Sequence, residues 1–425
     1  MDCLTTGMDI YFNRVKNNIN KVLRVFRSTP YGSKLRLPEH VDSYNDFVRI
    51  PLMSSGTLIR LGDDLLIKEP DVVCFYTSGT TGVRKKIYRA LSPPFLEEEL
   101  LRGHVCFIHT YIGEPHIGEY YTYYSIHDEY FRRKGFSSIV AYKDLLTLVN
   151  ALNEQYDVIF VYDCPAGVMR FLFFVEKAIR EGLLSPNILK RADLIIKITG
   201  EPISISTLRQ IYNRARRFFD TIRGIYVTYG TSEIGLIGVY KWRKHDALIL
   251  YRIVDDVFVE IIGKRNLPLK PGKPGEIVVT PLRTKGTILM RYRTGDIGYM
   301  ILKNKFPLLY VKGRHPKFEY VYVAGGQFSL RKLAEELVGK FRLPLKLTAS
   351  RYINEKVGEE VVRIDIYIPE EGLKIFPRIK EYCLNRVSHK ARITSQVEIG
   401  QVKIEIRPIV KTGHQRKSWM IKRNP

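Results

Sequence analysis

Residues 72–86 combine side chains that together suit the binding of an anion. Val72 to Tyr76 is an apolar run, which predicts a buried strand. Small residues, hydroxyls and finally cations follow it: Thr77, Ser78, Gly79, Thr80, Thr81, Gly82, Val83, Arg84, Lys85 and Lys86. Small residues let backbone N–H groups approach an anion closely, while hydroxyls and lysines add donors and positive charge. The segment therefore predicts a phosphate-binding loop, with a plain turn between two elements as the alternative.

Two further polar motifs follow predicted strands in the middle of the chain. They are Thr199-Gly200-Glu201-Pro202 and Tyr229-Gly230-Thr231-Ser232-Glu233. The surrounding pattern alternates strand, helix, strand, helix and strand over residues 157–162, 166–182, 193–199, 204–219 and 225–228. This alternation predicts a doubly wound parallel sheet and hence the α/β fold class. Ligands of such sheets bind outside the carboxyl ends of the strands, so we expect all three loops at one edge of one sheet.

The rest of the chain adds smaller units around this sheet. Apolar spacing predicts an amphipathic helix over residues 8–28 and short strands over residues 58–68. Short strands separated by Gly/Pro turns predict a β-rich subdomain at 257–262, 275–280 and 288–293. Beyond Gly313 we expect a small α+β unit, with strands near 320–323, 361–368 and 402–406 and helices near 330–340 and 376–386. The predicted domains are therefore 1–312 and 313–425.

Composition narrows the classes of function. A length of 425 residues indicates two or three domains. The formal charge of +24 favours anionic partners, with a solvated, highly charged surface as the alternative. No recognisable nucleic-acid module appears, which disfavours nucleic acid as the partner. The five cysteines form no C-x-x-C pair, and no apolar stretch is long enough to cross a bilayer, so we expect a cytoplasmic protein without a membrane partner.

Four spaced motifs together resemble the adenylate-forming superfamily of acyl-CoA synthetases and related ligases. Besides residues 76–85 and 229–233, they are Tyr292-Arg293-Thr294-Gly295-Asp296 and Gly313-Arg314. They occur in family order and at family-like spacing. Gly200-Glu201-Pro202, with residues 258–262 and 275–280, points towards the phenylacetate–CoA ligase-like branch. The resemblance covers nearly the whole chain.

The resemblance implies an ATP-dependent, AMP-forming carboxylate–CoA ligase with a large N-terminal adenylation domain and a small mobile C-terminal domain. A carboxylate would attack the α-phosphorus of ATP, and the thiol of coenzyme A would then displace AMP. Thr77 to Gly82 and Lys85 would hold the β- and γ-phosphates, and Glu233 would bind Mg²⁺. The other implied contacts are the α-phosphate for Ser232, adenine for Tyr229 and for Gly200-Glu201-Pro202, both ribose hydroxyls for Asp296, and the ribose region for Arg314. Gly230 and Thr231 belong to the same nucleotide-binding motif as Tyr229.

The chain departs from the family pattern at three places. Arg84 stands where the family loop usually has proline, and it adds a cation without removing the phosphate-binding residues. Lys317 occupies the expected hinge position after Gly313-Arg314. The family's C-terminal catalytic lysine matches either Lys411 or Lys417, of which we favour Lys417. The alternative for this tail is a frayed, basic C-terminus.

The acyl substrate and the acceptor stay open at this point. Residues 104–131 are rich in His and Tyr, which favours an aromatic wall and hence an aryl or arylacetic acid, with plain core packing as the alternative. Their His spacings do not place two ligands one helical turn apart, which disfavours a metal site there. Two other functions compete: acyl transfer to a protein thiol, and nucleotide or nucleic-acid binding without catalysis. Members of the branch are often dimers, so a homodimer is one option.

Overall fold

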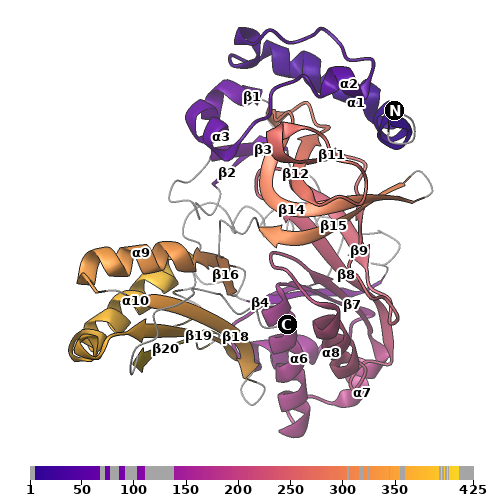
Figure 1. Cartoon of the computed structure of the whole chain (residues 1–425). Coiled ribbons are helices and arrows are strands. Elements are labelled where there is room, and N and C mark those ends of the chain that lie inside the picture. Colours follow the sequence, from indigo (N-terminus) through magenta and orange to yellow (C-terminus); the bar gives the residue numbers. More distant parts are fainter. Residues whose placement is uncertain are drawn as a thin grey trace.

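The N-terminal end of the molecule is helical. The computed structural model of the chain describes residues 5–67, 72–76, 86–90, 103–110, 138–303, 306–314, 320–323, 326–343, 345–354, 359–391, 394, 397, 400 and 402–410. The predicted amphipathic helix is α1 (Thr5–Ser28), and its apolar side lies in the main hydrophobic core. A 3-10 turn (Gly32–Lys34), α2 (Tyr44–Phe47) and α3 (Ser55–Leu61) follow and lie at the same end of the molecule (Figure 1). No helix within these described ranges is both long and apolar enough to cross a membrane.

One mixed sheet of eleven strands forms the body of the described structure. The strands follow the order β11, β12, β14, β15, β10, β9, β8, β7, β6, β4 and β5. The parallel strands are β4 (Val105–Thr110), β5 (Ser138–Tyr142), β6 (Val158–Asp163), β7 (Asp193–Ile198) and β8 (Thr221–Thr231). The antiparallel strands are β9 (Gly235–Lys241), β10 (Tyr251–Ile253), β11 (Val257–Ile262), β12 (Gly275–Pro281), β14 (Tyr292–Lys303) and β15 (Phe306–Arg314). The predicted α/β class is confirmed, and the β-rich part continues the same sheet.

Helices connect the parallel strands and cover one face of them, so the strands all run in the same direction. The connecting helices are α5 (Leu145–Leu152), α6 (Pro165–Arg180), α7 (Pro186–Arg191) and α8 (Ile205–Ala215), and Figure 1 shows α6, α7 and α8 grouped beside β7. Phe171 of α6 and Ile196 of β7 belong to the same buried cluster. Gly182 ends the α6 region with a φ of 73°, a left-handed conformation that glycine adopts without strain. The loops after β6, β7 and β8 therefore leave from one edge of the sheet.

Ser204 begins α8, directly after the motif at the end of β7. Its hydroxyl accepts a hydrogen bond from the backbone N–H of Thr207 at 3.1 Å. Replacing Ser204 with alanine should lower the free energy of unfolding by about 1 kcal/mol, because this N–H loses its acceptor. The comparison variant is Ser206→Ala, which removes a hydroxyl that lies 2.7 Å from Ser204 Oγ but leaves the cap itself, and it should cost less than about 0.5 kcal/mol. Urea unfolding measures both, and equal midpoints would contradict the capping role.

The expected place of β2 (Val72–Tyr76) in the main sheet is wrong. β2 pairs antiparallel with β3 (Lys86–Ala90) in a separate two-stranded sheet. The intervening segment, 77–85, is too short for the crossover of about a dozen or more residues that parallel strands require. β3 still lies against the main body, because the Tyr88 N–H donates to Thr287 Oγ1 at 2.9 Å.

The strands expected over residues 58–68 are also largely wrong, because this segment is mostly helical. Ser54 Oγ accepts from the Thr57 N–H at 3.2 Å and starts α3, a capping box that the apolar pattern obscured. A 3-10 turn (Gly62–Leu65) follows, and only β1 (Leu66–Ile67) is extended, pairing with β13 (Gly286–Thr287). The strand expected at 288–293 begins only at Tyr292, the first residue of β14.

The C-terminal part is a small α+β unit with its own hydrophobic cluster. A three-stranded sheet contains β18 (Lys346–Asn354), β19 (Glu359–Ile368) and β20 (Val402–Val410), while β16 (Tyr320–Val323) pairs with β17 (Gly326–Ser329). Figure 1 shows α9 (Leu330–Phe341) and α10 (Phe376–Ala391) together on this sheet. Its buried cluster runs from Val323 to Ile406, and the main cluster runs from Met8 to Leu309. A domain boundary between residues 312 and 313 remains our proposal, supported by these separate clusters.

Candidate functional site

Glu233 lies in the tight turn between β8 and β9. The carboxylate is buried, and its Oε1 accepts a hydrogen bond from the Tyr292 hydroxyl at 3.1 Å. Burial, and then the Glu233 charge, raise the pKa of Tyr292, which therefore stays a donor. On the backbone side, the Arg283 guanidinium donates to the carbonyls of Glu233 at 2.8 Å and of Ile234 at 2.9 Å. The turn is held on both sides, so the buried Glu233 carboxylate has a fixed position.

Asp296 forms the centre of a second polar group. Its Oδ2 accepts a hydrogen bond from the Tyr229 hydroxyl at 2.8 Å, and its Oδ1 lies 3.1 Å from Arg314 Nε. Arg314 also donates to the carbonyl of Thr294 at 2.7 Å. Burial raises the pKa of the Asp296 carboxyl, and it outweighs the lowering effects of Arg314 and Tyr229. Tyr229 and Arg314, from two other sequence motifs, thus both contact the buried Asp296 carboxylate, which could also accept hydrogen bonds from the hydroxyl groups of a ligand.

Glu201 lies at the same edge, in the loop after β7, and meets the C-terminal part of the chain. Its side chain is fully buried, and its Oε2 is 2.6 Å from Nη2 of Arg351 in β18. Gly200 has a φ of 82°, so this loop turns through a conformation that other residues rarely adopt. Tyr322 of β16 lies close to Arg314, which lowers the pKa of the tyrosine while burial raises it more strongly. The C-terminal part therefore contributes side chains to this edge.

The sequence analysis missed Arg351, which lies outside the nucleotide-binding motifs and pairs with Glu201 of this edge. The strand that contains it was not predicted, and its partner Glu201 is far away in the chain. A local signal exists, since Leu347 and Ala349 alternate with more exposed positions and Arg351 continues the inward-facing register. Arg283 and Tyr292 were not assigned roles either, although Tyr292 opens one of the motifs.

Several predicted site residues lie outside the described residues. They are the phosphate-binding residues 77–85, the hinge residue Lys317, and the candidate lysines Lys411 and Lys417. β3, which follows the predicted loop, is described and approaches the Glu233 turn. A Cβ added at Gly235, whose φ is 90°, would come 2.7 Å from Arg89 Nη1. The predicted phosphate loop therefore ends in a strand that lies against this turn.

Arg89 and Arg283 bring two positive charges to the Glu233 turn. Burial, and to a smaller extent the nearby Arg89 charge, lower the pKa of the Arg283 guanidinium to about 9. Two cations that repel each other in a partly buried place suit an anionic ligand between them. This charge supports phosphate binding near the turn.

The described residues offer no metal site made only of protein ligands. No group of three or more His, Cys, Asp or Glu side chains among them could hold a metal ion. Mg²⁺ commonly binds through one or two carboxylates together with phosphate oxygens and waters. The buried Glu233 carboxylate, with phosphate-attracting arginines beside its turn, fits this second kind of site.

A buried lysine lies on the face of the parallel strands opposite α6 and α8. Lys197 of β7 is 4% exposed, and its Nζ is 4.9 Å from the centre of the Tyr162 ring. Burial lowers the pKa of Lys197 to about 7. The single lysine in the apolar run of β7 was a signal that the sequence analysis did not use.

Of the His- and Tyr-rich residues expected to line an acyl pocket, 111–131 lie outside the described residues, so that expectation stays a prediction.

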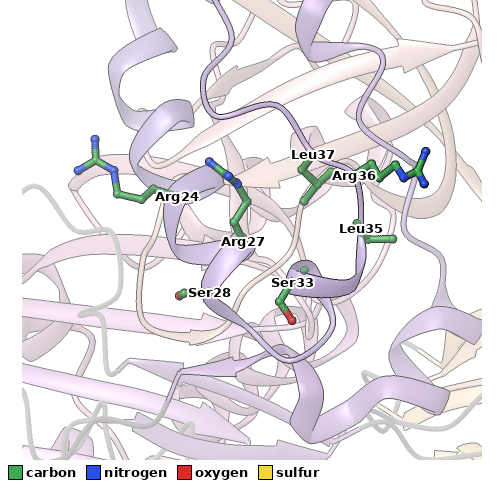
Figure 2. A pocket seen from close by; sticks show the side chains of 8 residues that line it. Arg24, Arg27, Ser28, Ser33, Leu35, Arg36 and Leu37 are labelled. Atoms are coloured by element: carbon green, nitrogen blue, oxygen red, sulfur yellow. The ribbon is translucent and has the colours of Figure 1, made fainter.

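A surface hollow at the end of α1 is not a converging anion site. It is lined by Arg24, Arg27, Ser28, Gly32, Ser33, Leu35, Arg36 and Leu37. Figure 2 shows the side chains of Arg24 and Arg36 pointing away from each other. Arg27 lies 3.9 Å from Glu39 in an exposed ion pair. Arg27 lies in the last turn of α1, where the helix dipole favours a cation.

Comparison with known proteins gives the fold. No protein-family model matches the chain, and no curated protein matches it significantly. The structure is similar to that of a 2-hydroxyisobutyryl-CoA ligase in complex with 2-HIB-AMP and CoA in the thioesterification state, with a TM-score of 0.65 and 13% identity over 96% of this chain and 89% of the ligase chain.

Two other structures of the same ligase score lower. An open conformation gives a TM-score of 0.51 at 13% identity, covering 96% of this chain and 90% of that chain. The postadenylation state gives 0.50 at 14% identity, covering 97% and 87%. At such identities the likeness concerns the fold alone, and this chain shares the fold of that CoA ligase.

Proposed function

We propose that the chain is an ATP-dependent carboxylate–CoA ligase that releases AMP. The observation that carries the proposal is the meeting of Tyr229, Asp296 and Arg314 around one buried carboxylate, beside the fixed Glu233 turn. These residues come from separate motifs of the family that the sequence resembles. The same fold in a ligase crystallised with an acyl-adenylate and CoA supports the proposal.

Each part of the site has a role in this proposal. Asp296 accepts the ribose hydroxyls, Arg314 holds Asp296 in place, and Tyr229 stacks on adenine above the loop that contains Glu201. Thr77 to Gly82 and Lys85 hold the β- and γ-phosphates, a role that rests on the sequence resemblance. Arg89 and Arg283 add positive charge near that end of the nucleotide.

The proposed reaction has two steps that share one nucleotide site. In the first, a carboxylate oxygen attacks the α-phosphorus, the bond to the bridging oxygen breaks, and pyrophosphate leaves. In the second, the sulfur of coenzyme A attacks the acyl carbonyl and AMP leaves with the oxygen that joined it to the acyl group. The protein has little covalent chemistry to do, so its contribution is positioning and charge neutralisation. Lys417, with Lys411 as the alternative, would meet the reacting carboxylate in the first step.

Glu233 would hold Mg²⁺ in the proposed site. When bound, this ion would neutralise phosphate charge and favour departure of pyrophosphate. Tyr292 and Arg283 keep the Glu233 carboxylate and its backbone in place for that role. The substrate that we propose is an aryl or arylacetic acid, as in the phenylacetate–CoA ligase-like branch, because residues 104–131 are rich in aromatic side chains.

ATP–pyrophosphate exchange over a panel of carboxylic acids tests the proposal. We expect exchange with at least one acid, highest with an aryl or arylacetic acid. AMP release should then depend on added coenzyme A, because the thioester step frees the site. AMP release without coenzyme A but with an acyl-carrier protein would indicate a protein thiol as acceptor. No exchange with any acid, together with salt-sensitive nucleic-acid binding, would contradict catalysis.

A further inference from the structure

Arg351 connects the C-terminal part of the chain to the edge of the main sheet. Its Nη2 is 2.6 Å from Glu201 Oε2, and its Nε pairs with Glu360 on the neighbouring strand β19. The Glu201 and Glu360 side chains are almost completely buried. Removing one member of a buried group of charges leaves the others uncompensated, which is costly. Removing the Arg351 charge should therefore cost more than breaking a surface ion pair.

A second arginine, in the large part of the chain, contacts the C-terminal part. Arg170 of α6 belongs to the large part, where it donates to the carbonyl of Lys143 at 3.2 Å. It also donates to the carbonyl of Gly400, just before β20, at 3.5 Å. The two contacts place the C-terminal part over the loop after β7 and beside α6. Figure 1 shows β18 next to α6 accordingly.

Only part of this arginine–carboxylate group depends on how the two parts of the chain are arranged. Arg351 and Glu360 lie on adjacent strands of one small sheet, so they stay together if that sheet moves. Glu201 belongs to the main sheet edge, so its contact with Arg351 exists only in an arrangement like the present one. That arrangement is more similar to the thioesterification state of the ligase than to its open or postadenylation state.

We propose that Arg351 is a positioning residue for the thioester-forming step. By pairing with Glu201, it holds the C-terminal part in the arrangement that this step uses, while adenylation proceeds without the pair. The role in catalysis rests on the proposed function. The tie itself, meaning the Arg351–Glu201 ion pair between the two parts of the chain, does not. Arg351 acts through the placement of the C-terminal part, and it touches no reacting atom.

Arg351→Gln tests the proposal, with Arg363→Gln as the matched control. Arg363 also lies in the small sheet and pairs with a carboxylate, Glu405, at 3.4 Å, but that pair stays within the C-terminal part. Without any substrate, hydrogen exchange of the backbone amides of Gly200, Glu201 and Ile203 should become faster in Arg351→Gln only. These amides lie in a loop, so their protection depends on what covers them. Arg351→Lys should restore part of the protection because it keeps the charge without the planar fork.

The catalytic part of the proposal has a separate readout. Thioester formation from supplied acyl-adenylate and coenzyme A should be about tenfold slower in Arg351→Gln, equivalent to about 1.4 kcal/mol, while ATP–pyrophosphate exchange stays within about twofold of wild type. Unchanged amide exchange at Gly200, Glu201 and Ile203 would overturn the tie. Equal losses in both half-reactions would overturn the positioning role. If the wild type exchanges with no acid, the proposed function fails, and the amide exchange still decides whether Arg351 ties the two parts together.

Discussion

Replacing Glu233 with glutamine should lower the rate of ATP–pyrophosphate exchange about 1000-fold. The amide keeps the shape and can still accept from the Tyr292 hydroxyl, which lies 3.1 Å from Oε1. It lacks the negative charge that Mg²⁺ requires, and a bound metal contributes several kcal/mol of charge stabilisation to a transition state. The loss should appear in exchange measured with the acid found in the panel, at saturating ATP.

Two controls separate this effect from a change in folding. Glu176→Gln removes another carboxylate, one that pairs with Arg214 at 3.0 Å on the helical face of the molecule, and it should leave exchange within about twofold. Chelation should abolish wild-type exchange, and added Mg²⁺ should restore it. In Glu233→Gln the concentration of Mg²⁺ needed for half-maximal exchange should rise. A variant with the wild-type rate and the wild-type Mg²⁺ dependence would exclude Glu233 as the metal ligand.

Replacing Asp296 with asparagine should raise the KM for ATP about 100-fold with little change in kcat. A hydrogen bond to a charged group is worth about 1.5–3 kcal/mol, and the ribose contact is made equally in the ground and transition states. Burial already raises the pKa of this carboxyl, so wild-type affinity for ATP should fall on acidification at a higher pH than for an ordinary aspartate. The ionised form accepts both ribose hydroxyls, and protonation below the raised pKa removes that ability.

A change of nucleotide distinguishes loss of the ribose contact from general damage. Wild type should prefer ATP strongly over 2′,3′-dideoxy-ATP, whereas Asp296→Asn should use the two almost equally. Tyr229→Phe is the companion variant, because it removes the hydroxyl that donates to Asp296 at 2.8 Å and keeps the ring for stacking. It should raise the KM less than about tenfold. Undiminished discrimination between the two nucleotides in Asp296→Asn would rule out the ribose contact.

Local patterns predicted three of the described parallel strands, β6, β7 and β8, but not β4 and β5. The signals for β6, α6, β7, α8 and β8 are all short-range: apolar runs for the strands, Gly182 at the end of α6 and Ser204 at the start of α8. β2 was also predicted correctly as a strand, yet its partner was not. Strand pairing depends on the length of the following connection, which the apolar run itself does not contain.

The candidate site divides in the same way. Tyr229, Glu233, Asp296 and Arg314 were predicted because each belongs to a short motif, and their role in a site stays a prediction. The structure joins Tyr229 and Arg314 to Asp296, and Glu233 to Tyr292 of the same motif as Asp296. The pairing of Arg351 with Glu201 could not be predicted, because ion pairs between distant segments leave no local pattern in a sequence that has 68 basic and 44 acidic residues. The one local signal was the inward-facing position of Arg351 in its strand, because a charge that faces inward is normally paired.

The continuous eleven-stranded sheet also bears on the order in which the chain folds. Tyr229 and Asp296 are 67 positions apart, and their strands, β8 and β14, have β9, β10 and β15 between them in the sheet. Such long-range contacts form late, because the connecting chain must first lose its conformational freedom. We therefore expect the parallel half to form before the two sides of the nucleotide site meet. A nucleotide that binds only the completed site would shift the folding equilibrium towards the folded state. The nucleotide concentration would therefore affect the stability of the folded chain as well as its rate of catalysis.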